Sequence, residues 1–189
     1  MQAAFQDSVH DSQQCFRHIL KAMSEPGTKV TLPSIDVELP IANATLSILL
    51  TLVDQSTSLW LDDDVRQRAL LDYLDFHVGA VVTRNTQDAS FAVVTDIGAI
   101  PDLTLFSVGT EEQPHGNCTL IIETSFQGKL SRLTGPGIEN DVELALGLPE
   151  PLLDQRQALS VLAPCGIDMI LVDGNDVIAL PRTTQIEVY

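Results

Sequence analysis

Basic residues are scarce in this sequence, and their scarcity limits what the protein can bind. The 189 residues include ten lysines and arginines against 26 aspartates and glutamates, so the formal net charge is −16. Nucleic acids and anionic membrane surfaces attract basic patches, and we therefore expect neither as a partner. The simplest interpretation of this acidity is solubility. A more specific one is a partner protein with a basic face.

Cysteine is also rare, and long apolar runs are missing. Cys15, Cys118 and Cys165 are scattered and form no C-x-x-C pair, which is typical of a reducing compartment. The longest apolar run, from Ala44 to Val53, has the length of a core helix and is too short to span a bilayer. The first residues have neither the basic flank nor the apolar core of a signal peptide. We expect a cytoplasmic protein that does not enter membranes.

Metal sites lack the residue spacing that they require. His10, His18, His77 and His115 form no pair at the spacing of a helical or finger-type site. The run of aspartates at 62–64 lacks the spaced oxygen ligands and the glycine of a calcium loop. We expect it to be the solvated first turn of a helix, and we predict no metal.

A nucleophilic catalytic set is also missing. The sequence has no G-x-S-x-G motif. Cys165 follows a proline in "APCGID", but no neighbour in the sequence would lower its pKa. We expect a small buried residue at the entrance of a strand. We therefore predict no catalytic residue.

Helical periodicity is present at the start of the chain. Phe16, Ile19, Leu20 and Met23 recur at the spacing that places them on one helix face. Either Ser8 or Asp11 could cap the start of this helix, and Pro26-Gly27 ends it.

Helices and strands then alternate along the chain. We expect helices at 41–53 and 62–76, partly helical structure at 143–163 interrupted by two prolines, and short strands at 28–32, 58–61, 79–83, 91–95, 118–124 and 129–135. Residues 168–188 are typical of a hairpin whose turn is Asp173–Asp176. Such alternation predicts an α/β fold with a mixed sheet covered by helices on both faces. No linker divides the chain, so we treat residues 1–189 as a single domain.

The segment "RLTGPGIEN" is a candidate phosphate loop or a turn. A Walker loop needs four residues between its glycines and then a lysine, but one residue separates Gly135 from Gly137. Pro136 lacks a backbone N–H donor, and Glu139 would repel a phosphate. A structural turn at a surface or interface is the simpler interpretation. Arg132 just upstream keeps an anion site open as the alternative.

The segment "PRTT" near the end of the chain is a second candidate. Arg182 with Thr183 and Thr184 could bind an anion. The arginine could equally reach a partner's carboxylate from the edge of a sheet. The residue types alone do not separate these two interpretations.

The order of several fragments resembles one family. The sequence is similar to the PhnH family from about residue 9 to residue 188, through "HDSQQCFRHILKAMSEPG", "LLTLVDQSTSLWL", "FHVGA", "TLIIE", "RLTGPGI", "GIDMILV" and "ALPRTTQIEV". Each fragment is weak by itself, and their ordered combination is specific.

The resemblance implies a subunit of the bacterial carbon–phosphorus lyase core complex. Members of the family are homodimers with a fold similar to that of pyridoxal-phosphate-dependent transferases, without that cofactor. With companion subunits they form the alpha-D-ribose 1-methylphosphonate 5-triphosphate synthase complex. This complex couples methylphosphonate to the ribose of ATP and releases adenine, before a radical enzyme cleaves the carbon–phosphorus bond. No catalytic residue is assigned to these subunits.

The residues agree with the absence of the cofactor. A pyridoxal-phosphate enzyme needs a lysine for its Schiff base. Lys21, Lys29 and Lys129 are not in the serine- or glycine-rich surroundings of such a pocket. We therefore expect no cofactor.

Our leading hypothesis is a non-catalytic subunit of this complex, required for organophosphonate utilisation. Its partners would be a second copy of the chain and the companion subunits. The alternative is a binding protein or enzyme for a phosphonate or nucleotide, with an anion site formed by Arg132, Gly135, Gly137, Arg182, Thr183 and Thr184. That alternative requires the two arginines to converge. A third hypothesis is a free-standing dimer with a regulatory partner.

Overall fold

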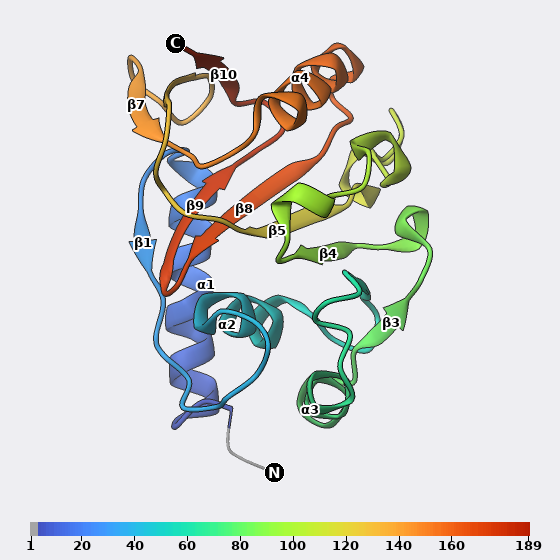
Figure 1. Cartoon of the computed structure of the whole chain (residues 1–189). Coiled ribbons are helices and arrows are strands. Elements are labelled where there is room, and N and C mark those ends of the chain that lie inside the picture. Colours follow the sequence, from blue (N-terminus) through green and yellow to red (C-terminus); the bar gives the residue numbers. More distant parts are fainter. Residues whose placement is uncertain (1–3) are drawn as a thin grey trace.

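A seven-stranded mixed sheet forms the centre of the computed structural model, which describes residues 4–189 (Figure 1). Its strands, in spatial order, are β1 (Val30–Thr31), β9 (Asp176–Leu180), β8 (Asp168–Asp173), β5 (Thr119–Glu123), β4 (Phe91–Val94), β2 (Ser58–Leu61) and β3 (Val81–Thr83). The strands from β8 to β3 are parallel. β9 turns back against β8, and β1 pairs antiparallel with β9.

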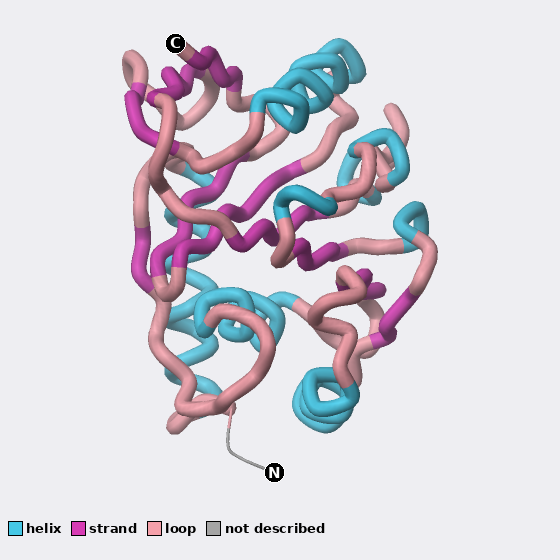
Figure 2. The backbone as a smooth tube through the Cα atoms, viewed as in Figure 1, coloured by secondary structure: helices cyan, strands magenta, loops and turns pink. Residues whose placement is uncertain are grey.

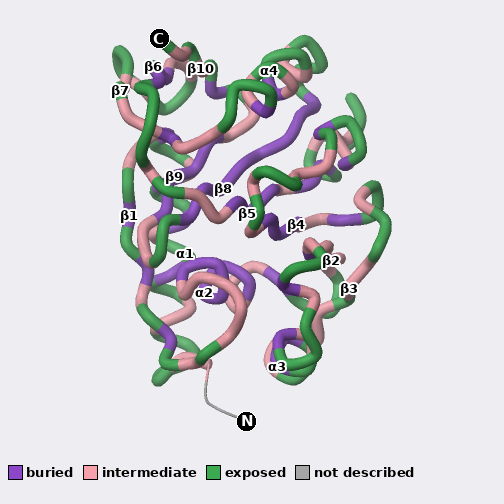
Figure 3. Tube along the Cα trace, in the orientation of Figure 1, coloured by how far each residue is buried: buried purple, intermediate pink, exposed green. Residues whose placement is uncertain are grey.

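Helices α1 (Ser8–Ser24), α2 (Asn43–Leu52) and α3 (Arg68–Val78) cover one face of this sheet. The central strands are buried on both faces, and their side chains alternate between two cores. Ile121 of β5 packs with the helices, while Leu120 and Ile122 enter the core on the opposite face. Figure 3 shows α2 and the central strands as the most continuously buried parts of the chain.

The opposite face is covered by α4 (Glu150–Leu159) and by a second sheet. This antiparallel sheet has the order β10 (Gln185–Val188), β6 (Leu130–Thr134) and β7 (Val142–Ala145). The α/β class with a mixed sheet is confirmed. The sequence did not predict the second sheet, which does much of the covering that we expected from helices (Figure 2).

Short 3-10 helices fill several connections within residues 4–189. They are η1 (Thr86–Asp88), η2 (Ile97–Ala99), η3 (Leu103–Leu105), η4 (Pro114–Gly116) and η5 (Ser160–Leu162). Among the helices of this part of the chain, none is both long enough and apolar enough to cross a bilayer.

The first helix has the predicted extent but a different cap and a different buried face. Asp7 is the N-cap, and its carboxylate accepts hydrogen bonds from the amides of the next turn. The buried residues are Cys15, Ile19 and Ala22. Phe16 and Leu20 are 48% and 55% exposed. The predicted face is confirmed for Ile19, which is buried, and for Met23, which packs against the core, and it is wrong for Phe16 and Leu20, whose places in the core are taken by Cys15 and Ala22.

The third helix begins later than predicted. It starts at Arg68 and has no acidic residue in its first turn. The aspartates at 62–64 precede it, and Asp62 has a specific role there. Its carboxylate accepts hydrogen bonds from the amide of Val65 at 3.3 Å and from the amide of Thr95 at 2.5 Å. The solvated helix start that we predicted is therefore wrong for Asp62, which links two loops.

The predicted hairpin is confirmed for β8 and β9 and ends at Leu180. Gly174 takes the positive φ of the turn, at 62°. The chain then leaves the large sheet, and β10 pairs with β6 in the second sheet. The partly helical segment divides in the same way, because its first residues form β7 and its later ones form α4.

Candidate functional site

Arg182 is held by its own chain. Its guanidinium donates to both carboxylate oxygens of Asp168, at 2.9 and 3.3 Å, and to the side-chain oxygen of Asn117 at 3.0 Å. A further bond reaches the carbonyl of Pro114 at 2.6 Å. The Arg182 and Asp168 side chains are only 20% and 11% exposed. The carboxylate that this arginine reaches is thus internal, and its donors are occupied.

Arg156 of α4 fixes the same segment from the protein interior. It is buried and donates to the carbonyls of Ile167 (3.0 Å), Leu180 (3.4 Å), Pro181 (2.6 Å) and Thr184 (3.2 Å). Burial lowers the pKa of its guanidinium to about 10. Arginine carries several fixed donors, and here they hold the segment that joins the two sheets.

We call residues 181–184, together with Arg156, Asp168 and Asn117, the junction. The sequence analysis missed the role of Arg156, because an arginine on a helix is usually exposed and nothing local indicates its burial. Thr184 is buried, and its hydroxyl has no hydrogen-bond partner among the described residues.

The Gly-Pro-Gly segment forms a turn that packs against its surroundings. Gly135 accepts a hydrogen bond from the amide of Ile138 at 3.1 Å. Both glycines have positive φ, 130° at Gly135 and 85° at Gly137. Gly137 packs against the end of α1. A Cβ at this position would lie 2.2 Å from the carbonyl oxygen of Ser24, so only glycine fits here. The turn thus packs one end of the second sheet against the end of the first helix.

Arg132 lies elsewhere, on the exposed face of the second sheet. Its Nε is 3.2 Å from Asp141 and 3.9 Å from Glu143. Across the sheet it is also the register partner of Glu187 on β10. Arg132 and Arg182 line different cavities. An anion site that uses both arginines therefore has no support in this geometry.

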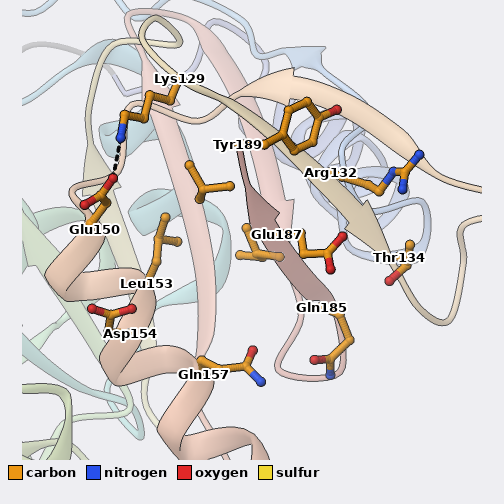
Figure 4. A pocket seen from close by; sticks show the side chains of 12 residues that line it. Lys129, Arg132, Thr134, Glu150, Leu153, Asp154, Gln157, Gln185, Glu187 and Tyr189 are labelled. Atoms are coloured by element: carbon orange, nitrogen blue, oxygen red, sulfur yellow. Dashed lines mark hydrogen bonds and ion pairs between the residues drawn. The ribbon is translucent and has the colours of Figure 1, made fainter.

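Two adjoining cavities of about 600 Å³ each flank α4, and we call them together the α4 groove. The first lies between α4 and strands β10 and β6, and Figure 4 shows it from close by. The second is lined mainly by apolar residues, among them Leu146, Leu148, Pro149 and Pro151. Side chains of Leu153 and Val188 line both. The two adjoining cavities make the groove the candidate functional site.

The first cavity of the groove is lined by three acidic and two basic side chains. Lys129 is paired with Glu150, and this pair keeps the pKa of the Glu150 carboxyl below its usual value. Asp154 of α4 and Glu187 of β10 line the same cavity, and neither forms an ion pair within residues 4–189. In Figure 4, Arg132 lies on the opposite side of β10 from α4. Glu187 points to the same side of β10 as its register partner Arg132, so Asp154 is the carboxylate on the α4 side that suits a cationic group.

The carboxyl ends of the parallel strands are a second place where open α/β sheets bind ligands, at the point where strand order reverses. Here the reversal lies between β2 and β4, next to Asp62 and Thr95. Asp62 is already bonded to the loop after β4. Glu123, at the end of β5, accepts from the amide of Ala42 at 2.7 Å, and burial raises the pKa of its carboxyl. Both carboxyl groups serve to connect loops.

The reactive residue types are in unreactive surroundings. All three lysines form surface ion pairs, Lys21 with Glu25, Lys29 with Asp176 and Lys129 with Glu150. A Schiff-base lysine is desolvated in a pocket, so none of the three fits a pyridoxal-phosphate site.

The three cysteines are buried. Burial raises the pKa of the Cys118 thiol to about 12 and also raises the pKa of Cys15. Cys165 is buried three residues before β8, as predicted. Residues 4–189 contain no group of three or more side chains that could hold a metal ion.

Comparison with known proteins assigns the chain to a family. Residues 3–187 match the family described as "Bacterial phosphonate metabolism protein (PhnH)". The chain is 33% identical over 188 residues to "Alpha-D-ribose 1-methylphosphonate 5-triphosphate synthase subunit PhnH" of Rhizobium meliloti, covering 97% of this chain and 94% of that protein. It is 31% identical over 183 residues to "Putative C-P lyase subunit protein HtxG" of Stutzerimonas stutzeri, covering 92% and 85%. The chain therefore belongs to the PhnH family of bacterial phosphonate metabolism proteins.

Proposed function

We propose that the chain is a non-catalytic subunit of a carbon–phosphorus lyase core complex. In this complex, methylphosphonate is coupled to the ribose of ATP before the carbon–phosphorus bond is cleaved. The observation that carries the proposal is the family match across residues 3–187, together with relatives named as subunits of that synthase and of a C–P lyase. The contribution of the chain is to assemble and position companion subunits.

The chemistry of the described residues supports a role without catalysis by this chain. The arginines that could bind a phosphonate are engaged with carboxylates, and the lysines are in ion pairs. Most of the cysteine thiols are held protonated by burial. The α4 groove has unpaired acidic groups, which would repel a phosphonate or a nucleotide.

The proposal includes four finer features. The chain acts as a single domain, forms a homodimer, works in the cytoplasm and has a fold similar to that of pyridoxal-phosphate-dependent transferases without their cofactor. Exposed apolar side chains support an assembling protein, since Val9, Phe16 and Leu20 are spaced along one side of α1. The net charge of −16 favours companion subunits with basic faces.

Co-purification tests the proposal. The tagged chain is produced with its companion subunits, and the mass and phosphonate-ribosylating activity of the assembly are measured with and without the chain. We expect a defined assembly whose activity collapses when the chain is left out, although the chain alone has none. Salt should weaken the association, because charges on the surface are screened.

The result that contradicts the proposal is equally clear. It is wrong if the chain stays separate from the companion subunits, or if the chain alone turns over a phosphonate or binds a nucleotide tightly. A mass measurement of the chain at several concentrations tests the homodimer separately.

A further inference from the structure

Strand β10 forms one of the two edges of the second sheet. It pairs with β6 on one side, and within residues 4–189 it has no strand on the other. In an antiparallel pair, the residues whose backbone groups point to the partner alternate with those whose groups point away. The amide of Tyr189 donates to the carbonyl of Leu130, so Tyr189 and Glu187 point toward β6. The backbone groups of Ile186 and Val188 therefore point outward from the sheet.

The open edge adjoins the α4 groove. Residues of β10 and of α4 line the same cavity, and β10 lies between α4 and β6 (Figure 4). The groove is therefore bounded on one side by unpaired backbone donors and acceptors. An extended segment that binds here could continue the sheet by pairing with β10, a common mode of peptide recognition. The apolar cavity beside Leu146 and Leu148 could receive alternate side chains of such a segment.

The charges beside the open edge favour a basic segment over a second copy of the chain. Asp154 of α4 and Glu187 lie on opposite faces of β10, and neither forms an ion pair in the described part of the chain, although Arg132 is the register partner of Glu187. A second copy of β10 would bring its own Glu187 to the same edge, and like charges near each other across strands destabilise pairing. An extended segment with lysine or arginine beside apolar residues meets the opposite conditions.

We propose that the α4 groove binds an extended basic and apolar segment of a companion subunit, which adds as a strand to β10 and presents cationic side chains to Asp154 on the α4 side and to Glu187 on the other face of β10. This inference rests on the proposed function for the source of the segment. It adds the surface, the mode of binding and the chemistry of the partner. The backbone of β10 provides the affinity, and the two carboxylates and the apolar cavity provide the selectivity.

The sharpest test removes one outward-pointing backbone donor. Val188→Pro deletes the N–H that would bind the added strand but none that binds β6, and proline is tolerated at such an edge position. Val188→Ala shortens the same side chain and keeps the N–H, so it is the matched control. We expect Val188→Pro to weaken binding to the companion subunits by about tenfold or more, and Val188→Ala by less than about threefold. The unfolding midpoint of each variant shows whether it is folded.

Two independent measurements accompany this test. Hydrogen exchange at the amides of Ile186 and Val188 should slow on assembly, while the amide of Glu187 is already protected by β6. Reversing both carboxylates, Asp154→Lys with Glu187→Lys, should weaken assembly at low salt, and the wild-type and variant affinities should converge at high salt.

The outcomes separate the two proposals. If the wild-type assembly forms but proline and alanine act alike and neither amide is protected, the groove inference is wrong and the proposed function stands. If the chain alone protects both amides in a concentration-dependent way, the occupant is a second copy and the inference is wrong. If no assembly forms, the proposed function fails and the inference with it.

Discussion

The junction precedes β10 and the α4 groove runs along it, and their arginines are in opposite surroundings. Arg156 and Arg182 in the junction are mostly buried, and their donors are occupied by carbonyls and one carboxylate. Arg132, which lines the groove from the exposed face of the second sheet, has a side chain 47% exposed and bridges to two exposed acids. The same residue type therefore maintains the fold in one place and adjusts surface charge in the other.

This difference indicates that the junction has a structural role and the groove a binding role. The junction fixes where β10 starts, because it holds the carbonyls of residues 180, 181 and 184. The groove beside β10 is left polar, hollow and acidic. A rigid attachment at one end of a strand and an open edge along it suit a surface that a partner binds. Replacing each arginine by methionine, which keeps much of the aliphatic stem, tests this division.

The largest effect is expected for Arg156→Met. The substitution removes a donor from four carbonyl groups, of which Pro181 keeps the bond from the amide of Thr184, and an unsatisfied buried polar group costs about 1–3 kcal/mol. We expect the free energy of unfolding to fall by at least about 3 kcal/mol, after some of the carbonyls find water. Urea unfolding measures the change. A loss below about 1 kcal/mol would mean that the junction does not depend on this side chain.

Arg182→Met should come next. It leaves the partly buried carboxylate of Asp168 without its cation and removes the donor to Asn117. Breaking a buried pair costs about 3–5 kcal/mol, and the remaining exposure of Arg182 reduces this, so we expect about 2 kcal/mol. The double variant Arg182→Met with Asp168→Asn should be less destabilised than the sum of the two single variants, because no unpaired charge remains. Strict additivity would contradict the ion-pair account.

The same contrast explains which parts of the fold were predictable. The β8–β9 hairpin and the apolar helix α2 depend on neighbouring residues, and the sequence predicted both. The second sheet pairs Ser131 with Val188, and no local pattern indicates a contact over that separation. The predicted start of α3 was wrong, and Asp62 before it bonds instead to Thr95, again a distant residue. Local signals predicted the elements, and long-range pairing decided their arrangement.

The candidate site was harder to predict for a related reason. The sequence identified Arg132 and Arg182 by residue type, but their roles depend on burial and on partners far along the chain. It missed Arg156, whose burial comes from the packing of α4 under the junction. The groove itself is lined by residues of β6, α4 and β10, which are separate in the sequence. The Gly-Pro-Gly turn was predicted correctly because missing phosphate-loop residues are a local signal.

Arg132→Met should have little effect on stability. Exposed ion pairs contribute about 0–1 kcal/mol, so we expect a loss of less than about 0.5 kcal/mol in the same urea measurement. The variant also makes the sheet face more acidic, which should leave the association with a basic companion subunit intact or strengthen it at low salt. An anion site at Arg132 predicts the reverse, a loss of function without a loss of stability. Comparison with Arg182→Met separates a structural arginine from a surface one.

The smallest effect concerns Tyr189, beside the groove. A hydrogen bond to Glu143 and the charge of that carboxylate raise the pKa of the Tyr189 hydroxyl above its usual value. Since the folded pKa exceeds the unfolded one, the stabilisation is fully present below the unfolded pKa of about 10 and is lost as the pH rises through the folded pKa. Tyrosinate absorbance in a Tyr73→Phe background, which leaves Tyr189 as the remaining tyrosine, measures this titration. Glu143→Gln should move the pKa of Tyr189 back toward its usual value, whereas Arg132→Met should raise it further, because the nearby cation favours the charged phenolate. An unchanged titration in both variants would mean that the charges on this sheet face act too weakly to influence what binds beside it.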